Sequence, residues 1–279
     1  MRTFGIFAKT FPGTAPAPVL AAVAAAGYGA AHFNMACCGL APMPDHIAAG
    51  TAEAVAGAAK AAGVSLVGLS GTWNMIHPDP AVRATGLRRL EVLASVSGAM
   101  GVRLITLCTG TRDPVDQWRA HPENGTAEVW RDLLANMEQA IAIAERYGVD
   151  LGIEPELANV VDSAAKARRL IGEIGSSRLK IVLDPANLFE VETPERRRAI
   201  VSAAAELLSD RIVMAHAKDR DAAAHFVAAG QGVIDFAHFF GVLKAAGFAG
   251  PVVTHGLQAH EAPGVAKVLR RCADEAGWQ

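Results

Sequence analysis

Short apolar runs alternate with longer alanine-rich stretches along the whole chain, and this alternation sets the expected secondary structure. Each short run has five or six residues and is rich in β-branched or aliphatic side chains, as buried strands are. The runs begin about 30 to 40 residues apart, which is the length of one strand–helix unit. Such alternation predicts parallel strands joined by helices. The predicted strands are Thr3–Phe7, Ala30–Asn34, Ser65–Leu69, Arg103–Cys108, Asp150–Glu154, Lys180–Asp184, Arg211–His216 and Pro251–His255.

Residues that cap helices stand where the alanine-rich stretches begin and end. Thr126 precedes one such stretch, Thr193 followed by proline opens another, and Asp162 or Ser163 can cap a third. Glycine ends helical stretches in the segments AAGY, AAGV, AMGV, RYGV and AAGF, each just before a predicted strand. The local signals therefore agree with the strand–helix alternation.

Eight strand–helix units in 279 residues fit one (β/α)8 TIM barrel, which usually takes about 250 residues. No Pro/Ser-rich linker or charge block divides the chain, so we assign residues 1–279 to a single domain. An open doubly wound sheet is the alternative. The segment after the first predicted strand, AKTFPGTAP, lacks the GxGxxG fingerprint of nucleotide-binding sheets. The expected fold class is therefore α/β, a single TIM barrel.

Composition and charge narrow the expected partners and compartment. Hydrophobic residues make up 51% of the chain and the formal net charge is −2, so the balance indicates neither nucleic acid nor a membrane as a partner. The four cysteines form no CxxC pair, and the N-terminal residues lack the apolar segment of a signal peptide. We therefore expect a cytoplasmic protein that acts on a small molecule.

Active-site residues of TIM barrels lie at the C-terminal ends of strands, so the residue that ends each predicted strand matters most. Glu154, Asp184, His216 and His255 end the fifth to eighth predicted strands. Neighbouring strands lie about 5 Å apart, so these four side chains can reach one point. Two carboxylates and two imidazoles suit Mn²⁺, Co²⁺, Fe²⁺ or Zn²⁺ better than Ca²⁺. Taken one at a time, each residue has a simpler explanation. Asp184 could cap a helix, a histidine could lie buried in the core, and Glu154 could bind a substrate hydroxyl. Together the four residues predict a metal site.

Other polar and aromatic residues near the strand ends are candidates for substrate binding. Lys218 can hold an anionic group or pair with a neighbouring acid, and the same two roles are open to Arg112. Trp73 can stack on a sugar face or simply pack in its loop, and His77 can bind a hydroxyl or shape the loop before proline. The substrate-binding candidates are Lys9, Asn34, Trp73, His77, Arg112, Asn187 and Lys218.

Four segments carry a family resemblance through their order and spacing. They are IEPE at Glu154, LDPANLF at Asp184, HAKD at His216, and GQGVIDF followed by GFAGPVVTHG, which contains His255. Over its whole length the chain resembles the xylose isomerase-like TIM barrel superfamily. That group holds sugar phosphate isomerases and epimerases, inosose dehydratase-like lyases and apurinic endonucleases.

The resemblance implies one divalent cation held by Glu154, Asp184 and His216. Mn²⁺ is the first expectation, with Co²⁺, Zn²⁺, Fe²⁺ or Mg²⁺ as alternatives. His255 stands where the family usually has a fourth, glutamate ligand, and Asn187 stands where a histidine is common. In the ketose epimerases two metal-bound glutamates exchange the substrate proton, so His255 departs from that symmetric scheme. Homodimers and homotetramers are common in the superfamily, and either assembly is open for this chain.

On this resemblance we expect a metal-dependent isomerase or epimerase of a keto-sugar or related polyol, working through a metal-stabilised enediolate. Glu154, Glu156 or His255 would take the proton next to the carbonyl. A lyase or dehydratase acting on a keto-sugar or cyclitol is the first alternative, because elimination starts from the same intermediate. More distant alternatives are an endonuclease of abasic DNA, which needs three zinc ions and a positive groove, and a barrel that binds a sugar without turning it over.

Overall fold

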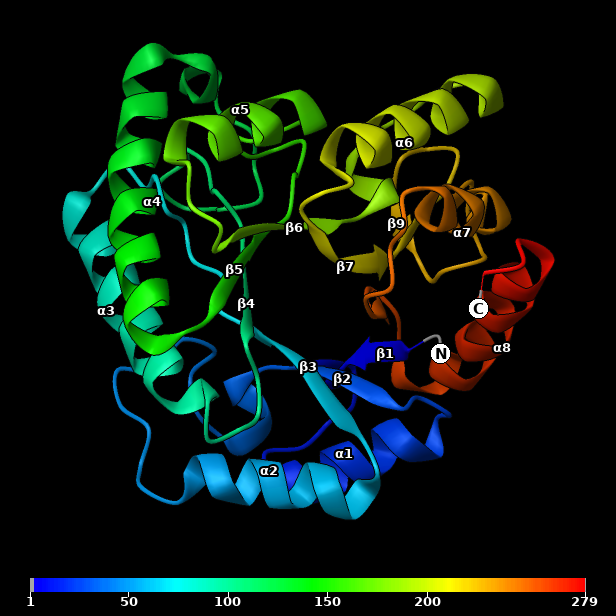
Figure 1. The fold of residues 1–279 in the computed structure, drawn as a ribbon, viewed down its shortest axis with the longest axis horizontal. Helices are drawn as coiled ribbons and strands as arrows, with labels where there is room; N and C mark the ends of the chain where they lie inside the picture. The colour runs from blue at the N-terminus through cyan, green and yellow to red at the C-terminus, as the bar shows by residue number, and fades with distance from the viewer. Residues whose placement is uncertain (1–2, 279) are drawn as a thin grey trace.

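The computed structural model describes residues 3–278, in which eight parallel strands close into a barrel (Figure 1). Around the barrel the strands follow the order β1-β10-β7-β6-β5-β4-β3-β2, and β2 pairs with β1 to complete the circle. This is the TIM barrel that the sequence predicts. The barrel strands are β1 (Phe4–Phe7), β2 (Ala30–Phe33), β3 (Ser65–Ser70), β4 (Leu104–Leu107), β5 (Asp150–Ile153), β6 (Leu179–Leu183), β7 (Ile212–Ala217) and β10 (Val252–Thr254).

Helices cover the outside of the barrel (Figure 1); α1 to α7 each lead from one barrel strand towards the next, and α8 follows the last strand, β10. This connection returns the chain to the same end, so all the barrel strands run parallel. The helices are α1 (Pro16–Ala25), α2 (Thr51–Ala62), α3 (Pro80–Ser97), α4 (Ala127–Tyr147), α5 (Ala164–Ile174), α6 (Pro194–Leu208), α7 (Phe236–Ala245) and α8 (Ala262–Glu275). Single 3₁₀ turns lie in the loops as η1 (Ala8–Thr10), η2 (Met35–Cys38), η3 (Pro122–Gly125), η4 (Pro185–Asn187) and η5 (Ala259–Glu261).

The eight predicted strands are confirmed, and each differs from the observed strand by no more than one residue at either end. β7 extends to Ala217, so His216 lies inside that strand rather than at its last residue. The sequence pattern missed an antiparallel hairpin of β8 (Asp219–Arg220) and β9 (Phe226–Val227), which follows β7. Its strands have two residues each, and such short strands leave no periodic pattern to recognise.

Helix caps explain why the helices begin and end where they do. Thr126 and Thr193 cap α4 and α6 through their side-chain oxygens, as predicted. Of the two candidates for α5, Ser163 is the cap, because its side chain accepts the backbone N–H of Lys166. Gly148 ends α4 with φ of 70°, a conformation that other residues adopt only with strain.

The barrel closes where the two ends of the described chain meet, close to the N and C labels of Figure 1. Phe4 of β1 pairs in register with Val252 of β10. Outside this seam the buried rings of Phe4, Phe240 and Trp278 pack with centroids 5.4 to 6.0 Å apart. Aromatic packing of this kind stabilises the contact beyond the burial of apolar area, so it joins β1 to α7 and to the residues after α8.

The barrel interior is filled by side chains rather than open. Leu104, Val182, Met214 and Val253 form a buried apolar cluster contributed by β4, β6, β7 and β10. Gly152 of β5 makes room for this cluster, since a Cβ there would lie 2.9 Å from Val182. The packed interior forces polar side chains of these strands to the rim.

The loop after β3 packs a buried tryptophan against α3 at a point where only glycine fits. Trp73 is 8% exposed, and a Cβ on Gly86 of α3 would lie 2.1 Å from its indole nitrogen. The indole therefore holds the β3–α3 loop against the first turns of α3.

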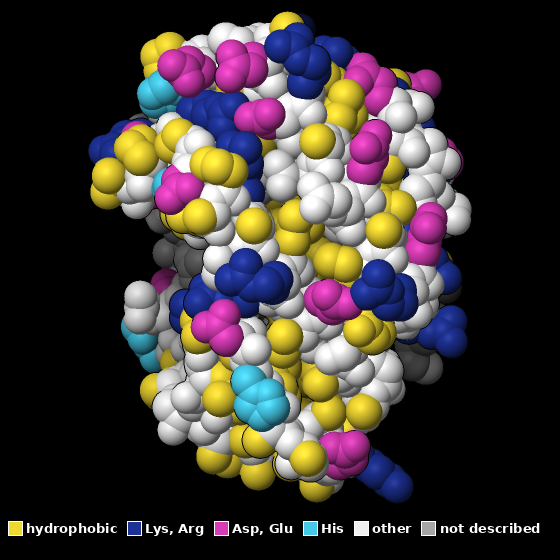
Figure 2. Space-filling view, turned by 90° about the vertical axis from the view of Figure 1, so that its left-hand side faces the viewer, with side chains coloured by type: hydrophobic (Ala, Val, Ile, Leu, Met, Phe, Trp, Pro, Cys, Tyr) yellow, Lys and Arg dark blue, Asp and Glu magenta, His cyan; other side chains and the backbone are white. Residues whose placement is uncertain are grey.

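The surface over α3 and α4 mixes charges of both signs. This side of the barrel, at the left of Figure 1, faces the viewer in Figure 2, where Lys and Arg side chains are interspersed with Asp and Glu. No helix within residues 3–278 combines the length and apolar character that crossing a bilayer requires.

We expect Gly86→Ala to lower the free energy of unfolding by about 1 to 3 kcal/mol, because the added methyl group displaces the Trp73 indole. Urea unfolding followed by circular dichroism measures the change at constant m value. Gly98→Ala is the matched control, since a Cβ at Gly98 meets nothing within 4 Å and its backbone is already helical. Equal stability of the two variants would contradict this account of the loop.

Candidate metal centre

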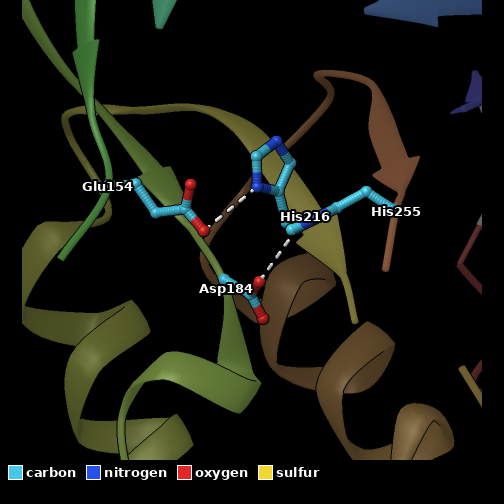
Figure 3. Close-up of side chains that lie close together, drawn as sticks. All are labelled: Glu154, Asp184, His216 and His255. Atoms are coloured by element: carbon cyan, nitrogen blue, oxygen red, sulfur yellow. Dashed lines mark hydrogen bonds and ion pairs between the residues drawn. The ribbon is translucent and has the colours of Figure 1, made fainter. Parts of the chain in front are cut away.

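Four potential metal ligands converge at the C-terminal rim of the barrel (Figure 3). Glu154 follows β5, Asp184 follows β6, His216 lies near the end of β7 and His255 follows β10. These strands are neighbours in the barrel, in the order β5-β6-β7-β10. One ligand atom from each of the four side chains lies within 4.8 Å of the other three. The four side chains thus surround a single point, as their strand positions predict.

Two acid–imidazole contacts organise the cluster, and both are drawn as dashed lines in Figure 3. His216 Nδ1 lies 3.2 Å from Glu154 Oε1, and His255 Nε2 lies 3.3 Å from Asp184 Oδ2. The two imidazole rings are 4.5 Å apart between centroids. Asp184 also caps η4, because its other oxygen, Oδ1, accepts the backbone N–H of Ala186 at 2.9 Å. Asp184 can therefore cap η4 through Oδ1 and still offer Oδ2 to a metal, so the two interpretations are compatible.

The charges in the cluster hold both acids in their ionised form. Burial by itself raises the pKa of Glu154, but the neighbouring His216 outweighs it, and the pKa is lowered. Burial likewise opposes ionisation of Asp184, yet Lys218 and His255 hold the pKa of its carboxyl below its usual range. Burial favours neutral His216, but Glu154 and Asp184 reverse that and raise its pKa. His255 differs, since burial and the charge of His216 lower its pKa.

The donor set fits a divalent transition metal. Two ionised carboxylates and two imidazoles supply the mixed oxygen and nitrogen ligands that Mn²⁺, Fe²⁺, Co²⁺ and Zn²⁺ accept. His216 Nε2 is buried and has no hydrogen-bond partner within residues 3–278. A buried nitrogen without a partner is costly, and coordination or a bridging water would remove that cost. These four residues form a group that is able to bind a metal.

Asn187 and Lys218 contact the two acids of the cluster. Two of the predicted substrate-binding residues therefore lie at the site. The side-chain amide of Asn187 donates from Nδ2 to Glu154 Oε1 at 2.8 Å, and its Oδ1 accepts from Lys218 Nζ at 2.6 Å. Lys218 Nζ also lies 3.7 Å from Asp184 Oδ2 and 3.8 Å from the centroid of the Phe226 ring. The neighbouring acid that pairs with Lys218 is therefore Asp184.

Glu156 and Asn34 are not members of the cluster. Burial raises the pKa of Glu156 to about 7, and its carboxylate accepts no hydrogen bond from the described residues. Asn34 caps η2 through its side chain, which accepts the N–H of Ala36 at 2.9 Å. Lys9 is exposed on η1, directly after β1.

Trp73, His77 and Arg112 are engaged in the loops after β3 and β4 and are not brought to the cluster. Arg112 donates from Nη1 to the carbonyl of Ile76 at 3.0 Å and pairs with Asp132 of α4. His77 contacts the Pro114 carbonyl at 3.1 Å and accepts the N–H of residue 79 at 3.0 Å, so both ring nitrogens are occupied. The contacts of His77 and Arg112 are those of the loop-structure and ion-pair alternatives, and their role as substrate-binding residues stays a prediction.

Three polar residues near the site were missed by the sequence reasoning. His32 of β2 is buried, its Nε2 lies 2.9 Å from Thr106 Oγ1, and its ring is 5.8 Å from that of His216. Burial holds the pKa of His32 well below its usual value. Arg220 follows HAKD directly and stacks on Phe226, with its guanidinium carbon 4.4 Å from the ring centroid.

Asp219, the third missed residue, fixes the glycine-rich loop that follows the hairpin. Its buried carboxylate accepts backbone N–H groups of Gly230 at 2.9 Å, Gly232 at 3.0 Å and Ile234 at 3.0 Å. The alternation of strand residues could have indicated His32, because it points to the same side as Asn34. Arg220 and Asp219 carry no such signal, because their roles depend on contacts with the hairpin and the glycine-rich loop.

The chain belongs to the xylose isomerase-like TIM barrel family, whose sequence profile matches residues 20–275. Among curated relatives it is similar to the L-ribulose-5-phosphate 3-epimerase UlaE of Shigella flexneri serotype 5b (strain 8401), with 24% identity over 199 residues. That match covers 71% of this chain and 65% of the relative, so the chain spans just under two thirds of its length.

Solved structures share the fold at low sequence identity. The 3-keto-D-glucoside 4-epimerase YcjR of E. coli, in its apo form, has a TM-score of 0.77 and 17% identity, covering 98% of this chain and 100% of that one. The IOLI protein, solved with a bound zinc atom, has a TM-score of 0.75 and 16% identity, covering 99% and 100%. The fold is therefore one that sugar epimerases use.

We expect metal analysis of the purified chain dialysed against Mn²⁺ to find about one ion per chain. Asp184→Ala removes an ionised ligand, so affinity should fall by about a hundredfold or more, which corresponds to about 2.7 kcal/mol. Asp162→Ala is the control, because that acid pairs with Lys166 on the surface. Unchanged metal content in the Asp184→Ala protein would contradict the assignment.

Asn187→Ala should weaken metal binding by about 10- to 100-fold, since Glu154 then loses the amide that fixes its orientation. Isothermal titration with Mn²⁺ measures the affinity. Replacing Asn124 by alanine removes an amide of the β4–α4 loop instead and should leave the affinity unchanged. The supporting role is wrong if the two variants bind the metal equally well.

Proposed function

We propose that the protein is a divalent-metal-dependent isomerase or epimerase of a keto-sugar or related polyol. The observation that carries this proposal is the meeting of Glu154, Asp184, His216 and His255 within 4.8 Å on one barrel rim. Membership in the xylose isomerase-like family and similarity to the epimerase UlaE support the sugar as substrate. Mn²⁺ is the proposed cation, and a homodimer or homotetramer is the proposed assembly.

The cation would supply Lewis-acid polarisation of a carbonyl and its neighbouring hydroxyl, which makes the adjacent C–H bond more acidic. The chain itself must supply a base. We assign this role to Glu156, because its carboxylate lies beside the cluster and is free of hydrogen bonds from the described residues. Glu154 is less available, since His216 and Asn187 both contact its Oε1.

His255 makes the two faces of the site chemically different. An imidazole whose pKa is lowered by burial stands where the family usually has a carboxylate, so it remains neutral beside Asp184. A neutral imidazole accepts a proton through its unprotonated ring nitrogen, but a nitrogen that held a metal would no longer be free to do so. We therefore propose that Glu156 removes the proton and, once protonated, returns it to the neighbouring carbon in an isomerisation, while His255 serves as a ligand.

The remaining polar groups of the mouth would orient the substrate. Lys218 carries a positive charge next to Asp184 and Asn187, where it can stabilise negative charge that develops on a substrate oxygen. Lys9 and Asn34 lie on the 3₁₀ turns after β1 and β2, on the same rim. We propose both as hydroxyl-binding groups.

Glu156→Gln should lower turnover by about 10²- to 10⁴-fold, because the amide cannot accept the proton. The measurement is incorporation of deuterium from D₂O into a panel of ketoses by the Mn²⁺-loaded protein, followed by NMR. Glu128→Gln, an exposed residue in the first turn of α4, is the matched control. Full exchange in Glu156→Gln would reassign the base.

Two results would reject the proposed reaction. Absence of deuterium exchange and of product across the panel would leave a barrel that binds a sugar without converting it. Release of water or of a leaving group, with no isomer formed, would establish the lyase alternative. One metal-holding group is present within residues 3–278, which suits chemistry with a single cation.

A further inference from the structure

The glycine-rich loop, residues 230–234, belongs to the same wall of the rim as the metal centre. Asp219, which holds this loop, directly follows Lys218, and Lys218 Nζ lies 3.7 Å from Asp184 Oδ2. A Cβ on Gly256, in the loop after β10, would lie 3.3 Å from the side chain of Lys218. The segments that follow β7 and β10 therefore meet at this lysine.

This position is where TIM barrels frequently bind a substrate phosphate. Backbone N–H groups of the loops after the seventh and eighth strands supply the donors there, together with the start of a short helix. β7 and β10 are the seventh and eighth barrel strands of this chain, and the short helix η5 follows β10. The partners of those N–H groups decide whether a phosphorylated substrate finds donors on this wall.

Each of the five successive backbone N–H groups of the glycine-rich loop already donates to an acceptor inside the protein. Asp219 Oδ2 accepts the first and the third, and Asp219 Oδ1 accepts the fifth. The second donates to the carbonyl of Ala228 at 3.0 Å, and the fourth donates to the carbonyl of Arg220 at 2.8 Å. In order, the five donors belong to Gly230, Gln231, Gly232, Val233 and Ile234. None of the five is left for a phosphate oxygen.

The carboxylate of Asp219 lies where a bound anion would lie. It is fully buried, and its Oδ1 also accepts the N–H of Arg220 at 2.8 Å, so four backbone donors surround it. A Cβ on Gly232 would lie 2.4 Å from Asp219 Oδ1 and 2.2 Å from the Arg220 carbonyl oxygen, so only glycine lets the loop close on the carboxylate. Converging backbone N–H groups form anion-binding sites in proteins, and here the chain supplies the anion itself.

A second carboxylate occupies the loop after β10. Glu261 Oε2 accepts the N–H of Gln258, the N-cap of η5, at 2.7 Å. Glu261 Oε1 accepts from Gln231 Nε2 at 3.0 Å, which ties this loop to the glycine-rich loop. A phosphate that approached the start of η5 would therefore meet a carboxylate, and the two negative charges would repel each other.

The two cations of this wall are also engaged inside the protein. Lys218 Nζ donates to Asn187 Oδ1 at 2.6 Å, and Arg220 donates to two backbone carbonyls at 3.1 and 2.8 Å. Both side chains are more than nine-tenths buried, and both cations stack on the ring of Phe226. A phosphate would lose its hydration here without gaining the charge-assisted hydrogen bonds that replace it.

We infer that the substrate is an unphosphorylated sugar or polyol, because the Asp219 carboxylate takes the place that a substrate phosphate would occupy. This inference rests on the proposed function, since the metal centre is where the sugar itself reacts. A neutral hydroxyl suits this wall, because it can donate a hydrogen bond to a carboxylate such as that of Glu156. A phosphate dianion only accepts hydrogen bonds and has no such partner here.

Isothermal titration of the Mn²⁺-loaded full chain with pairs of free and phosphorylated ketoses tests the inference. D-Fructose is compared with D-fructose 6-phosphate, and D-ribulose with D-ribulose 5-phosphate. At least one free ketose should bind, and its phosphate should bind about tenfold more weakly or worse, because no hydrogen bonds offset the loss of hydration. A phosphate that binds as tightly as its free ketose would overturn the inference, and so would no binding by any of the four sugars.

Lys9→Ala identifies a phosphate bound elsewhere on the rim. Lys9 is exposed on η1, which follows β1, and β1 pairs with β10. If a phosphorylated ketose binds more tightly than its free form and Lys9→Ala removes that advantage, the phosphate lies over β1 and the inference is wrong.

Asp219→Ala tests the internal anion itself. Four backbone donors then lack their acceptor, so the urea midpoint of unfolding should fall. Formate should bind in place of the lost carboxylate and restore about half of that fall or more, because it binds the folded chain. Asp79→Ala, at the exposed N-cap of α3, is the matched control and should gain nothing from formate. Equal responses of the two variants to formate would contradict the internal anion.

Asp219→Asn keeps the shape of the side chain and serves if the alanine variant does not fold. Its amide accepts hydrogen bonds through one atom only, so two of the four backbone N–H groups lose their acceptor. The tenfold preference for the free ketose should then narrow to about threefold or less. An unchanged preference in this variant would show that Asp219 does not exclude phosphate.

The inference and the proposed function fail in different ways. Deuterium exchange into a phosphorylated ketose, but not into its free form, rejects the inference and retains the isomerase or epimerase. Preferential binding of free ketoses, with no exchange into any sugar, retains the inference and rejects the reaction.

Discussion

Closure of the barrel is the constraint on which the rest of the structure depends. The parallel pairing of β1 with β10, sealed by Phe4, Phe240 and Trp278, brings the first and last parts of the chain into one sheet. Because all eight strands are parallel, the residues that follow them all lie at the same rim of the barrel. His255 reaches Asp184 only because β10 lies next to β7 in the closed circle.

Electrostatics gives the rim its chemical character. Two acids buried side by side would repel each other and resist ionisation. Here His216, His255 and Lys218 compensate them, and Asn187 links Lys218 to Glu154 through its two polar atoms. A divalent cation held by these four residues would complete this compensation, because their carboxylates are already ionised. With His255 in place of a second glutamate, the set of four residues carries less negative charge.

The rim also divides into two regions of different physical character. The side formed by β5, β6, β7 and β10 is charged and carries the potential ligands. The side formed by the loops after β2, β3 and β4 is apolar at its surface, with its charges paired internally. Arg112, His77 and Asp132 are part of that internal pairing, which keeps the apolar loops rigid. The two regions of the rim thus differ in charge and in how their polar groups are paired.

The sequence by itself determined the barrel, the helix caps and the four converging residues, because these follow from local periodicity and from the rule that strand ends share a rim. It could not determine which loop side chains pair with one another. Arg112 pairs with Asp132 and Asp113 with Arg119, partners chosen by how the β4–α4 loop folds back on itself and on α4. It also missed His32, Arg220 and the β8–β9 hairpin. Contacts of this kind depend on packing between segments far apart in the chain, and only the tertiary structure decides them.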